Sequence, residues 1–326
     1  MNVTVLGAGA WGTALAKIAS DNGHEVTLWG RDPALLASIS QERENKRYLA
    51  GVSLPGSWRF EPNLCRSSQG ADVLVMAVPS KGFRDVLRNL GGFQRAVVTV
   101  TKGIEFESGL TMSGVLESEF PDAIPVALSG PTIAREVATG MPAASVAASV
   151  DSKAAILVQE LFHRPTFRVY TSSDVLGVEL GGALKNVIAI AAGVCDGLGF
   201  GDNSKAALLT RGVAEIRRLG VAAGAKAETF TGLSGLGDLT VTCFSPLSRN
   251  RTFGEKLGKG GQLTEILAAS RSVVEGVPTA RSAHQLASRL KVEAPIVDEV
   301  FLMLHDAKPV KAALQSLLGR DSKHED

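Results

Sequence analysis

Cysteine is scarce in this sequence, and the few copies are far apart. Cys65, Cys195 and Cys243 are the three cysteines among 326 residues, and none belongs to a C-x-x-C or Cys/His pair. An odd, dispersed set of this kind argues against a disulfide framework and against structural zinc, and it is typical of a reducing compartment. We therefore expect a cytoplasmic protein.

Histidines in metal-binding patterns are also missing. The five histidines are scattered, with no metal-ligand spacing between any two of them: His24, His163, His284, His305 and His324. Their spacing argues against a metal site and against a histidine as the acid of a reaction. It directs attention to lysine as the acid instead.

The sequence has no excess of either charge and no long apolar run. Its 34 Lys and Arg residues nearly balance 33 Asp and Glu residues, so no overall field would hold nucleic acid, and an acidic ligand needs a local cluster. The longest apolar stretches, 137–150 and 180–195, are broken by Pro142 and Lys185 and fall short of the ~20 residues of a membrane span. The N-terminus does not resemble a signal peptide. We expect a soluble protein without membrane insertion.

Apolar residues are abundant, at 45% of the chain, which is enough for a sizeable core, and the length suggests two domains. In the first half, short β-branched runs alternate with helix-like segments. The alternation predicts a mostly parallel sheet with helices on both faces, as in a Rossmann domain. The predicted strands are 2–6, 24–29, 71–78, 96–101, 125–128, 143–148 and 167–171.

The rest of the chain is helix-like, which predicts an α/β Rossmann domain at 1–173 followed by an all-α domain at 174–326. Asp174 and Ser204 are predicted N-caps. The predicted helices are 174–193, 204–224, 263–270, 279–290, 296–307 and 310–318. Apolar residues of the second helix repeat at helical spacing and predict one buried face: Leu208, Leu209, Val213, Ile216 and Leu219.

A glycine motif directly follows the first predicted strand. Gly7, Gly9 and Gly12 form G-x-G-x-x-G, and a helix-like segment follows Trp11. The glycines permit a tight turn and close approach of a pyrophosphate, while the helix N-terminus offers unpaired N–H groups and the positive end of its dipole. In this context the motif predicts a dinucleotide site rather than a glycine turn that binds nothing.

The end of the second predicted strand carries Arg31 and Asp32. In Rossmann domains an acid at this place bonds the ribose 2′-hydroxyl of NADH, and an arginine accommodates the 2′-phosphate of NADPH. The pair therefore predicts at least NADPH use and leaves dual specificity open. A solvated loop charge is the alternative interpretation of Arg31.

Ligands of open parallel sheets lie beyond the carboxyl ends of the strands, where this sequence has the loops 78–81, 101–103 and 129–132. Lys102, in the second loop, is predicted to point into the cofactor crevice. There its charge would polarise a carbonyl or hold a phosphate. A surface charge is the alternative.

Lys185 is the only charged residue between Glu179 and Asp196, in an otherwise aliphatic helix, so we predict that it is at least half buried. Desolvation of an ammonium is costly and lowers its pKa, which makes a lysine usable as an acid or base near neutral pH. A lysine that snorkels to the helix surface is the alternative. The neighbouring Asn186 is placed to hydrogen-bond a hydroxyl or carbonyl.

Two polar segments remain in the helical half. The segment 232–238 is predicted as a glycine-rich loop that delivers the Asp238 carboxylate, with Thr242 shortly after it. The segment 248–251, Ser-Arg-Asn-Arg, brings together two guanidinium groups, whose planar forks match phosphate oxygens. It is therefore the best anion site outside the Gly7 loop, with a solvated basic turn as the competing interpretation.

Together these segments resemble the bacterial NAD(P)-dependent glycerol-3-phosphate dehydrogenases over nearly the whole chain. The resemblance implies a Rossmann domain joined to an all-helical domain like that of 6-phosphogluconate dehydrogenase, with the active site between them. It implies reversible reduction of dihydroxyacetone phosphate at C2 by NADPH or NADH, giving sn-glycerol 3-phosphate for glycerophospholipid synthesis, and homodimers are common among such enzymes. The matching segments are 7–15, 77–80, 101–105, 128–132, 179–186, 232–238, 248–250 and 274–276.

By the same resemblance, Lys185 is implied as the proton donor and acceptor at the C2 oxygen, and no metal is implied. The other implied substrate contacts are Lys102, Gly130, Thr132, Asp238, Thr242, Ser248, Arg249 and Asn250. Besides Gly7, Gly9 and Gly12, the implied cofactor contacts are Ala10, Trp11, Arg31, Lys102, Ala134, Arg249, Val273 and Glu275.

Two positions depart from the family pattern. Ala10 and Thr132 stand where members often carry serine, and neither change puts the reaction in doubt. Two alternatives share the predicted fold: a relative of 3-hydroxyacid or 6-phosphogluconate dehydrogenases, and a redox-sensing protein that binds the nucleotide without turnover.

Overall fold

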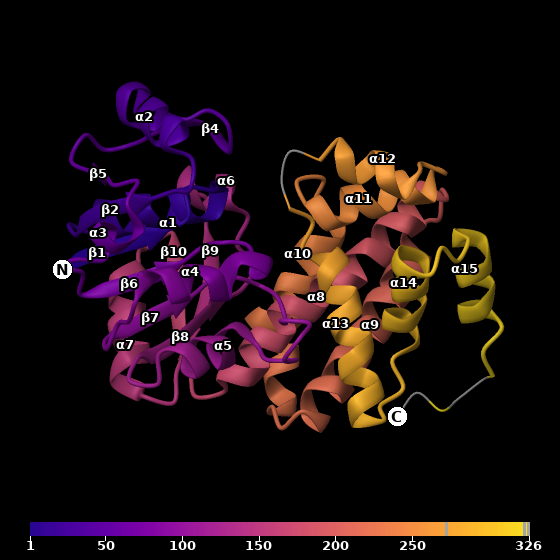
Figure 1. The fold of residues 1–326 in the computed structure, drawn as a ribbon. Helices are drawn as coiled ribbons and strands as arrows, with labels where there is room; N and C mark the ends of the chain where they lie inside the picture. The colour runs from indigo at the N-terminus through magenta and orange to yellow at the C-terminus, as the bar shows by residue number, and fades with distance from the viewer. Residues whose placement is uncertain (271–272, 322–323, 325–326) are drawn as a thin grey trace. The chain divides into compact units, whose positions relative to one another are not determined.

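The computed structural model describes residues 1–270, 273–321 and 324 as two compact units. The polar, charged segment 321–326 is typical of a solvated tail, and most of it lies outside the described residues. The N-terminal unit comprises Met1–Glu105 and Leu110–Glu179, and the C-terminal unit comprises Phe106–Gly109 and Leu180–Asp326. Figure 1 colours the strands and their helices indigo to rose, and the later helices from rose through orange to yellow. The α/β fold of the first unit and the helical fold of the second agree with the sequence prediction.

The main sheet of the N-terminal unit has the strand order β10-β9-β8-β7-β6-β1-β2-β5. Its paired strands run parallel, apart from the antiparallel pair β8–β9. The predicted strands all form, and the short β5 is an addition. The bounds are β1 (Asn2–Leu6), β2 (Glu25–Trp29), β5 (Arg59–Phe60), β6 (Val73–Met76), β7 (Ala96–Thr99), β8 (Ile124–Ser129), β9 (Ala143–Ala148) and β10 (Phe167–Ser172).

Alternating side chains of the strands fill two cores, one on each face of the sheet. Val5 belongs to the core under α1, α6 and α7, whereas Leu6 belongs to the core under α4 and α5. Burial of each aliphatic side chain contributes about 1.5–3 kcal/mol to the free energy of folding, so the sheet is stable and fixes the ends of the loops at its edge. The helices are α1 (Ala10–Asp21), α2 (Pro33–Glu42), α3 (Leu64–Ser67), α4 (Phe83–Leu90), α5 (Met112–Glu119), α6 (Ala134–Ala138) and α7 (Ser152–Phe162), with a 3-10 turn at Ser80–Gly82.

A small antiparallel hairpin, β3 (Glu44–Asn45) and β4 (Leu49–Ser53), follows α2. This hairpin was not predicted from the sequence, because β3 has two residues and shows no periodicity. Its side chain Asn45 is fully buried, so the hairpin packs onto the unit rather than extending into solvent.

The helix α8 (Val175–Gly197) begins in the N-terminal unit and continues into the C-terminal one, since the division falls between Glu179 and Leu180. Its predicted N-cap is confirmed: the Asp174 carboxylate accepts a hydrogen bond from the Gly177 amide at 3.0 Å. Glu179 accepts hydrogen bonds from Thr99 Oγ1 at 3.0 Å and from the Ser113 amide at 2.9 Å. Burial raises the pKa of Glu179.

The C-terminal unit is built around the remainder of α8. This helix is long and apolar enough to cross a membrane, with a mean hydropathy of 1.6, but 89% of its most apolar window is buried inside the protein. It is therefore a core helix. The other elements are α9 (Asp202–Ala222), a 3-10 turn (Ala227–Thr231), a π turn (Leu233–Gly237), α10 (Asp238–Phe244), α11 (Arg249–Gly258), α12 (Leu263–Ala268), α13 (Gly276–Leu290), α14 (Pro295–His305) and α15 (Val310–Leu318).

Glycines let α8 and α11 approach backbone to backbone. A Cβ on Gly193 of α8 would lie 1.9 Å from the Arg251 carbonyl oxygen, and one on Gly254 of α11 would lie 2.0 Å from that of Ile190. Neither position tolerates a side chain, so the start of α11 is held at a fixed place along α8.

For α9 the predicted N-cap is wrong, and the predicted buried face is confirmed in part. The helix begins at Asp202 after Gly201, so Ser204 lies inside it rather than capping it. Of the predicted apolar face, Ile216 and Leu219 are buried, whereas Leu208, Leu209 and Val213 are only partly so. Two other residues decide the contact face: Gly212, which packs on Ile188, and Glu215, whose carboxylate accepts hydrogen bonds from the first amides of α14.

Candidate active site

The glycine loop between β1 and α1 can be made only with glycine at two of its positions. Gly7 has φ +131°, and a Cβ there would lie 2.4 Å from the Ala77 carbonyl oxygen. A Cβ on Gly12 would lie 2.0 Å from the Gly7 carbonyl oxygen. These contacts let the strand, the loop and the helix pack closely.

Gly9 differs from both, because a Cβ there would meet nothing within 4 Å. It is the N-cap residue of α1, and no side chain in the described structure caps the first N–H groups of this helix. An open backbone face beside uncapped amides suits a pyrophosphate, which would receive hydrogen bonds and lie at the positive end of the helix dipole. The loop therefore fits the dinucleotide that the motif predicts.

Ala10 and Trp11 form the first turn of α1. The indole ring of Trp11 meets Phe167 edge to face, with 6.3 Å between ring centroids. Its Nε1 is buried and has no hydrogen-bond partner among the described protein atoms. Ala10 and Trp11 directly follow Gly9 in the sequence, so both lie next to the open face of the loop.

At the end of β2, Asp32 already has partners. Its Oδ1 accepts hydrogen bonds from the Ala34 and Leu35 amides at 3.1 and 3.2 Å and so caps α2, and its Oδ2 pairs with Arg47 at 3.3 Å. Arg31 beside it is exposed. The cap and the ion pair compete with any ribose hydroxyl for Asp32, whereas Arg31 is accessible to an anion.

Three predicted substrate residues meet beyond the ends of β7 and β8. The Gly130 carbonyl oxygen accepts hydrogen bonds from Lys102 Nζ at 3.3 Å and from Thr132 Oγ1 at 3.1 Å. A Cβ on Gly130 would lie 2.8 Å from the Ala144 carbonyl oxygen, so this turn also requires glycine. Ala134 follows as the first residue of α6. The N-terminal unit thus places the Lys102 ammonium and the Thr132 hydroxyl beyond the carboxyl ends of its strands, where ligands of parallel sheets bind.

Lys185 lies in the middle of α8 and is buried, with 6% of its surface exposed, which excludes the snorkelling alternative. Its Nζ donates hydrogen bonds to Asp238 Oδ1 at 2.7 Å and to Thr242 Oγ1 at 2.6 Å. Both acceptors are buried on α10, one turn apart, and the Thr242 hydroxyl donates to the Asp238 carbonyl at 2.6 Å. A buried ion pair with this many hydrogen bonds has a fixed geometry.

The segment 232–238 delivers Asp238 through a helical turn rather than the predicted loop. Leu233–Gly237 is a π turn that continues into α10. A Cβ on Gly235 would lie 2.2 Å from the Phe230 carbonyl oxygen, and one on Gly181 of α8 would lie 2.8 Å from that of Ser234. The glycines of this segment therefore bring α10 against α8, where Asp238 reaches Lys185.

The segment 248–251 is the start of α11. Ser248 is its N-cap and accepts a hydrogen bond from the Arg251 amide at 3.3 Å. Asn250 is buried; it donates to Asn186 Oδ1 at 2.8 Å and accepts from the Gly276 amide at 2.9 Å. Asn186, next to Lys185, is therefore bonded to α11, and the predicted substrate contacts of Ser248 and Asn250 stay predictions.

The two arginines of this turn differ. Arg251 donates from Nε to Asp196 Oδ2 at 2.7 Å, so it holds α11 to the end of α8. Arg249 is exposed and donates from Nη1 to the Val273 carbonyl at 3.1 Å. The protein around its guanidinium removes enough water to lower the pKa of Arg249, and Glu275 opposes this shift. Arg249, Val273 and Glu275, all predicted cofactor contacts, are thus neighbours.

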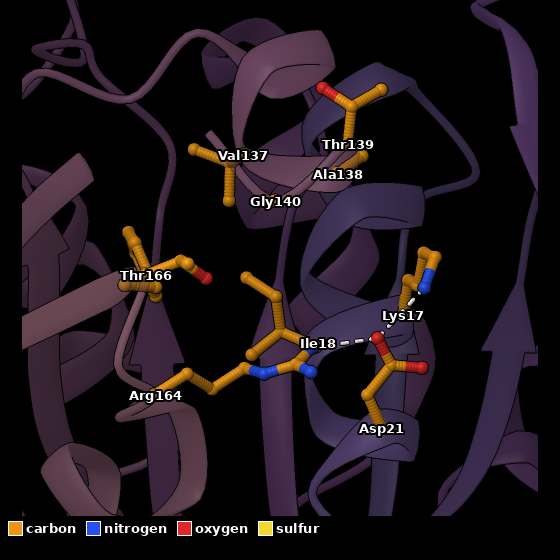
Figure 2. Close-up of a pocket in the computed structure, with 10 residues that line it drawn as sticks. Lys17, Ile18, Asp21, Val137, Ala138, Thr139, Gly140, Arg164 and Thr166 are labelled. Atoms are coloured by element: carbon orange, nitrogen blue, oxygen red, sulfur yellow. Dashed lines mark hydrogen bonds and ion pairs between the residues drawn. The ribbon is translucent and has the colours of Figure 1, made fainter. Parts of the chain in front are cut away.

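A separate cavity of about 180 Å³ lies in the N-terminal unit at the carboxyl-terminal half of α1 (Figure 2). Figure 2 shows Lys17 and Arg164 directed at Asp21, whose Oδ2 accepts a 2.7 Å hydrogen bond from each. Burial raises the pKa of Asp21, but these two hydrogen bonds outweigh it and lower the value. The pocket contains none of the predicted site residues, and the Asp21 carboxylate offsets the charge of one of its two cations.

In the residues that the structure describes, no group of three His, Cys, Asp or Glu side chains could hold a metal ion.

One buried polar side chain at the glycine loop was not predicted from the sequence: Asn45 of β3 donates a hydrogen bond to the Ala8 carbonyl at 3.0 Å. A lone asparagine between two short strands gives no sequence signal.

Comparison with known proteins covers both units. Residues 2–155 match the family described as the NAD-dependent glycerol-3-phosphate dehydrogenase N-terminus, and residues 174–315 match the corresponding C-terminus. A glycerol-3-phosphate dehydrogenase [NAD(P)+] of Geobacter metallireducens is 50% identical over 99% of this chain and 98% of its own length. That of Moorella thermoacetica is 48% identical over 99% and 97%.

Among solved structures, the fold is similar to glycerol-3-phosphate dehydrogenase from Coxiella burnetii. The TM-score is 0.94 at 37% identity, and the match covers 98% of this chain and 99% of that one. D-mandelate dehydrogenase, at a TM-score of 0.63 and 13% identity, shares the fold alone. The agreement of both units with one family favours it over the alternative dehydrogenases considered from the sequence.

Proposed function

The chain belongs to the NAD-dependent glycerol-3-phosphate dehydrogenase family, and from that premise we propose that it reversibly reduces dihydroxyacetone phosphate to sn-glycerol 3-phosphate. It is an oxidoreductase whose coenzyme is NAD(P), which when bound supplies or accepts the hydride at C2. The observation that carries the proposal is the buried cluster in which Lys185 contacts Asp238 and Thr242.

Lys185 is the proposed acid. As C2 gains a hydride, negative charge develops on its oxygen, and the ammonium of Lys185 gives that oxygen a proton; in the reverse direction the neutral amine takes it back. The Asp238 carboxylate favours the charged form of Lys185 between turnovers, and Thr242 fixes the direction of its Nζ. Among the three bonded side chains, Lys185 is the cation, so we propose it as the group that exchanges the proton.

Arg249 is the proposed anchor of the substrate phosphate, because it is an accessible guanidinium in the same unit as Lys185. The planar fork of arginine matches two phosphate oxygens. Ser248 and Asn250 flank it on α11, and Lys102, Gly130 and Thr132 supply the proposed substrate contacts of the other unit.

The proposed coenzyme contacts are the glycine loop and the residues that the family resemblance implies. Gly7, Gly9 and Gly12 with Ala10 and Trp11 are proposed to hold the pyrophosphate, and the further contacts are Lys102, Ala134, Arg249, Val273 and Glu275. Arg31 is proposed to bind the 2′-phosphate of NADPH. Asp32 supports this preference, because its carboxylate caps α2 and pairs with Arg47.

Cellular role, location and assembly are also proposed. The product is a precursor of glycerophospholipids, so we place the enzyme in phospholipid synthesis. A cytoplasmic location is supported by the three cysteines, all in described parts of the chain and all unpaired. A homodimer is proposed from the resemblance to the family.

The decisive experiment measures oxidation of NADPH and of NADH with dihydroxyacetone phosphate and with a panel of 3-keto acids. Reduction of NADP+ and of NAD+ is measured in parallel with 6-phosphogluconate-type substrates. The proposal expects turnover with the phosphorylated ketone and with NADPH. Turnover only with a keto acid would assign the alternative dehydrogenase. Tight coenzyme binding without turnover on any substrate would assign the redox-sensing protein, and activity with NADH alone would overturn the NADPH assignment.

A further inference from the structure

The β3–β4 hairpin contributes one side chain to the glycine loop. Asn45 is 0% exposed, and its Nδ2 donates hydrogen bonds to the Ala8 carbonyl at 3.0 Å and to Thr13 Oγ1 at 2.8 Å. Its Oδ1 accepts from the Tyr48 amide in its own hairpin at 3.2 Å. We propose that Asn45 is a positioning residue for the coenzyme's pyrophosphate, which acts by fixing the loop and the first turn of α1.

The two acceptors of Asn45 lie at opposite ends of the phosphate-binding segment. Ala8 stands between Gly7 and Gly9, and Thr13 follows Gly12 at the end of the first helical turn. A loop rich in glycine has no side chains of its own to restrict its backbone, so aiming its N–H groups at a ligand costs conformational entropy. One buried amide bonded to both ends removes part of that cost before the ligand arrives.

The chemistry of the site selects asparagine. The position needs two N–H donors and one acceptor on a short, uncharged group, and a carboxamide provides all three. Aspartate has the same shape but no donor, so its carboxylate would face the Ala8 carbonyl oxygen and the Thr13 hydroxyl. Alanine removes the donors without adding charge, and the pair of variants therefore separates the loss of hydrogen bonds from electrostatic repulsion of the phosphates.

The inference rests on the coenzyme binding described above, and it is tested by calorimetric titration of the protein with NADPH and NADP+. We expect the Kd of N45A to rise about tenfold, as for loss of one or two buried hydrogen bonds, and that of N45D to rise further. The matched controls are on Thr13: T13S keeps the hydroxyl and binds like the wild type, whereas T13V loses one of the two acceptors and gives a smaller rise.

Hydrogen exchange of the coenzyme-free protein provides a second measurement. N45A should speed exchange in peptides that cover residues 7–13, with little change in the other strands of the sheet, and kcat at saturating coenzyme should stay near that of the wild type. Faster exchange throughout the N-terminal unit would reduce Asn45 to a general structural role and overturn the proposal.

The outcomes separate this proposal from the function itself. A wild-type protein that binds neither coenzyme contradicts the proposed function. A wild type that binds, with unchanged Kd in N45A and N45D, contradicts only the role of Asn45. If both Asn45 variants fail to fold, an unchanged Kd in T13V overturns it as well.

Discussion

The two units form their proposed sites from different parts of the chain: the N-terminal unit uses backbone and the C-terminal unit uses side chains. In the N-terminal unit the coenzyme loop consists of backbone, because Gly7 and Gly12 leave no room for a Cβ and Gly9 leaves the front open. In the C-terminal unit, α8 and α10 bring side chains together, with Lys185 bonded to Asp238 and Thr242. Backbone amides suit any phosphate, whereas an ammonium at a fixed place suits one reaction. The comparison suggests that affinity for coenzyme and chemical turnover can be damaged separately.

The largest expected difference between the loss of turnover and the loss of coenzyme affinity comes from Lys185→Met. This substitution keeps the length of the side chain and removes the ammonium proton. We expect kcat to fall by about 10³-fold, within the range for loss of a general acid, with the Kd of NADPH unchanged. Stopped-flow measurement of NADPH oxidation and calorimetric titration give the two numbers.

Because Lys185→Met removes the ammonium that pairs with the buried Asp238 carboxylate, the variant should also lose stability. The double variant K185M/D238N is the control: it should melt at a higher temperature than K185M and remain as inactive. Wild-type kcat in K185M would refute the role of Lys185 as the acid.

A smaller effect within the same unit is expected from Arg249→Ala. Loss of one or two charge-assisted hydrogen bonds to phosphate, about 1.5–3 kcal/mol each, should raise KM for dihydroxyacetone phosphate about 100-fold. Arg249→Lys keeps the charge without the fork and should recover part of the loss. Arg251→Ala is the comparison in the same turn: it breaks the pair with Asp196 and should lower the melting temperature more than R249A does. A KM in R249A equal to that of the wild type contradicts the phosphate assignment.

In the N-terminal unit, Gly9→Ala should weaken coenzyme binding without weakening the fold. An added Cβ meets no protein atom within 4 Å, so we expect an unchanged melting temperature, but the methyl occupies the face where the pyrophosphate approaches. The Kd of NADPH should rise about tenfold, the loss of roughly one phosphate hydrogen bond. Gly12→Ala is the matched variant, because its Cβ would lie 2.0 Å from the Gly7 carbonyl and should lower the melting temperature. Equal melting curves for the two variants would contradict this distinction.

The same difference between backbone and side chains explains which parts of the site were predicted from the sequence. Gly7 and Gly12, which backbone contacts require, and Gly9, which leaves the loop open, form a motif with fixed spacing, so the dinucleotide loop was recognised from the sequence. Lys185 was recognised from the aliphatic residues around it. Asn45 was missed because its partners, Ala8 and Thr13, are distant in sequence and chemically ordinary.

Helix boundaries failed for related reasons. The helix α11 was not predicted, because its contacts with α8 use Gly254 and the ion pair of Arg251, neither of which adds to an apolar period. The buried face of α9 was predicted only in part, because besides Ile216 and Leu219 it contains Gly212 and Glu215, which add nothing to an apolar period. Packing by glycine and by buried polar groups is invisible to hydrophobic periodicity.

The smallest expected effect concerns a buried carboxylate that, unlike Asp238, is bonded to backbone amides. Glu215 accepts hydrogen bonds from the Ile296 and Val297 amides at 3.0 and 2.8 Å. Burial raises its pKa to about 7, despite those two bonds, which act to lower it. Since this value lies above that of an unfolded glutamate, near 4.3, folding is favoured by the bound proton. The contribution is complete below about pH 4.3 and is lost as the pH rises to about 7.

The variant Glu215→Gln cannot titrate, so the difference in unfolding free energy between wild type and E215Q should shift against the wild type as the pH rises from 5 to 7. The shift should be at most about 3 kcal/mol, because each unit of pKa corresponds to about 1.4 kcal/mol. Urea unfolding of both proteins at several pH values measures it, with kcat expected to be similar in the two. Parallel stability curves across this range would mean that Glu215 stays ionised in the folded protein, and would contradict its raised pKa.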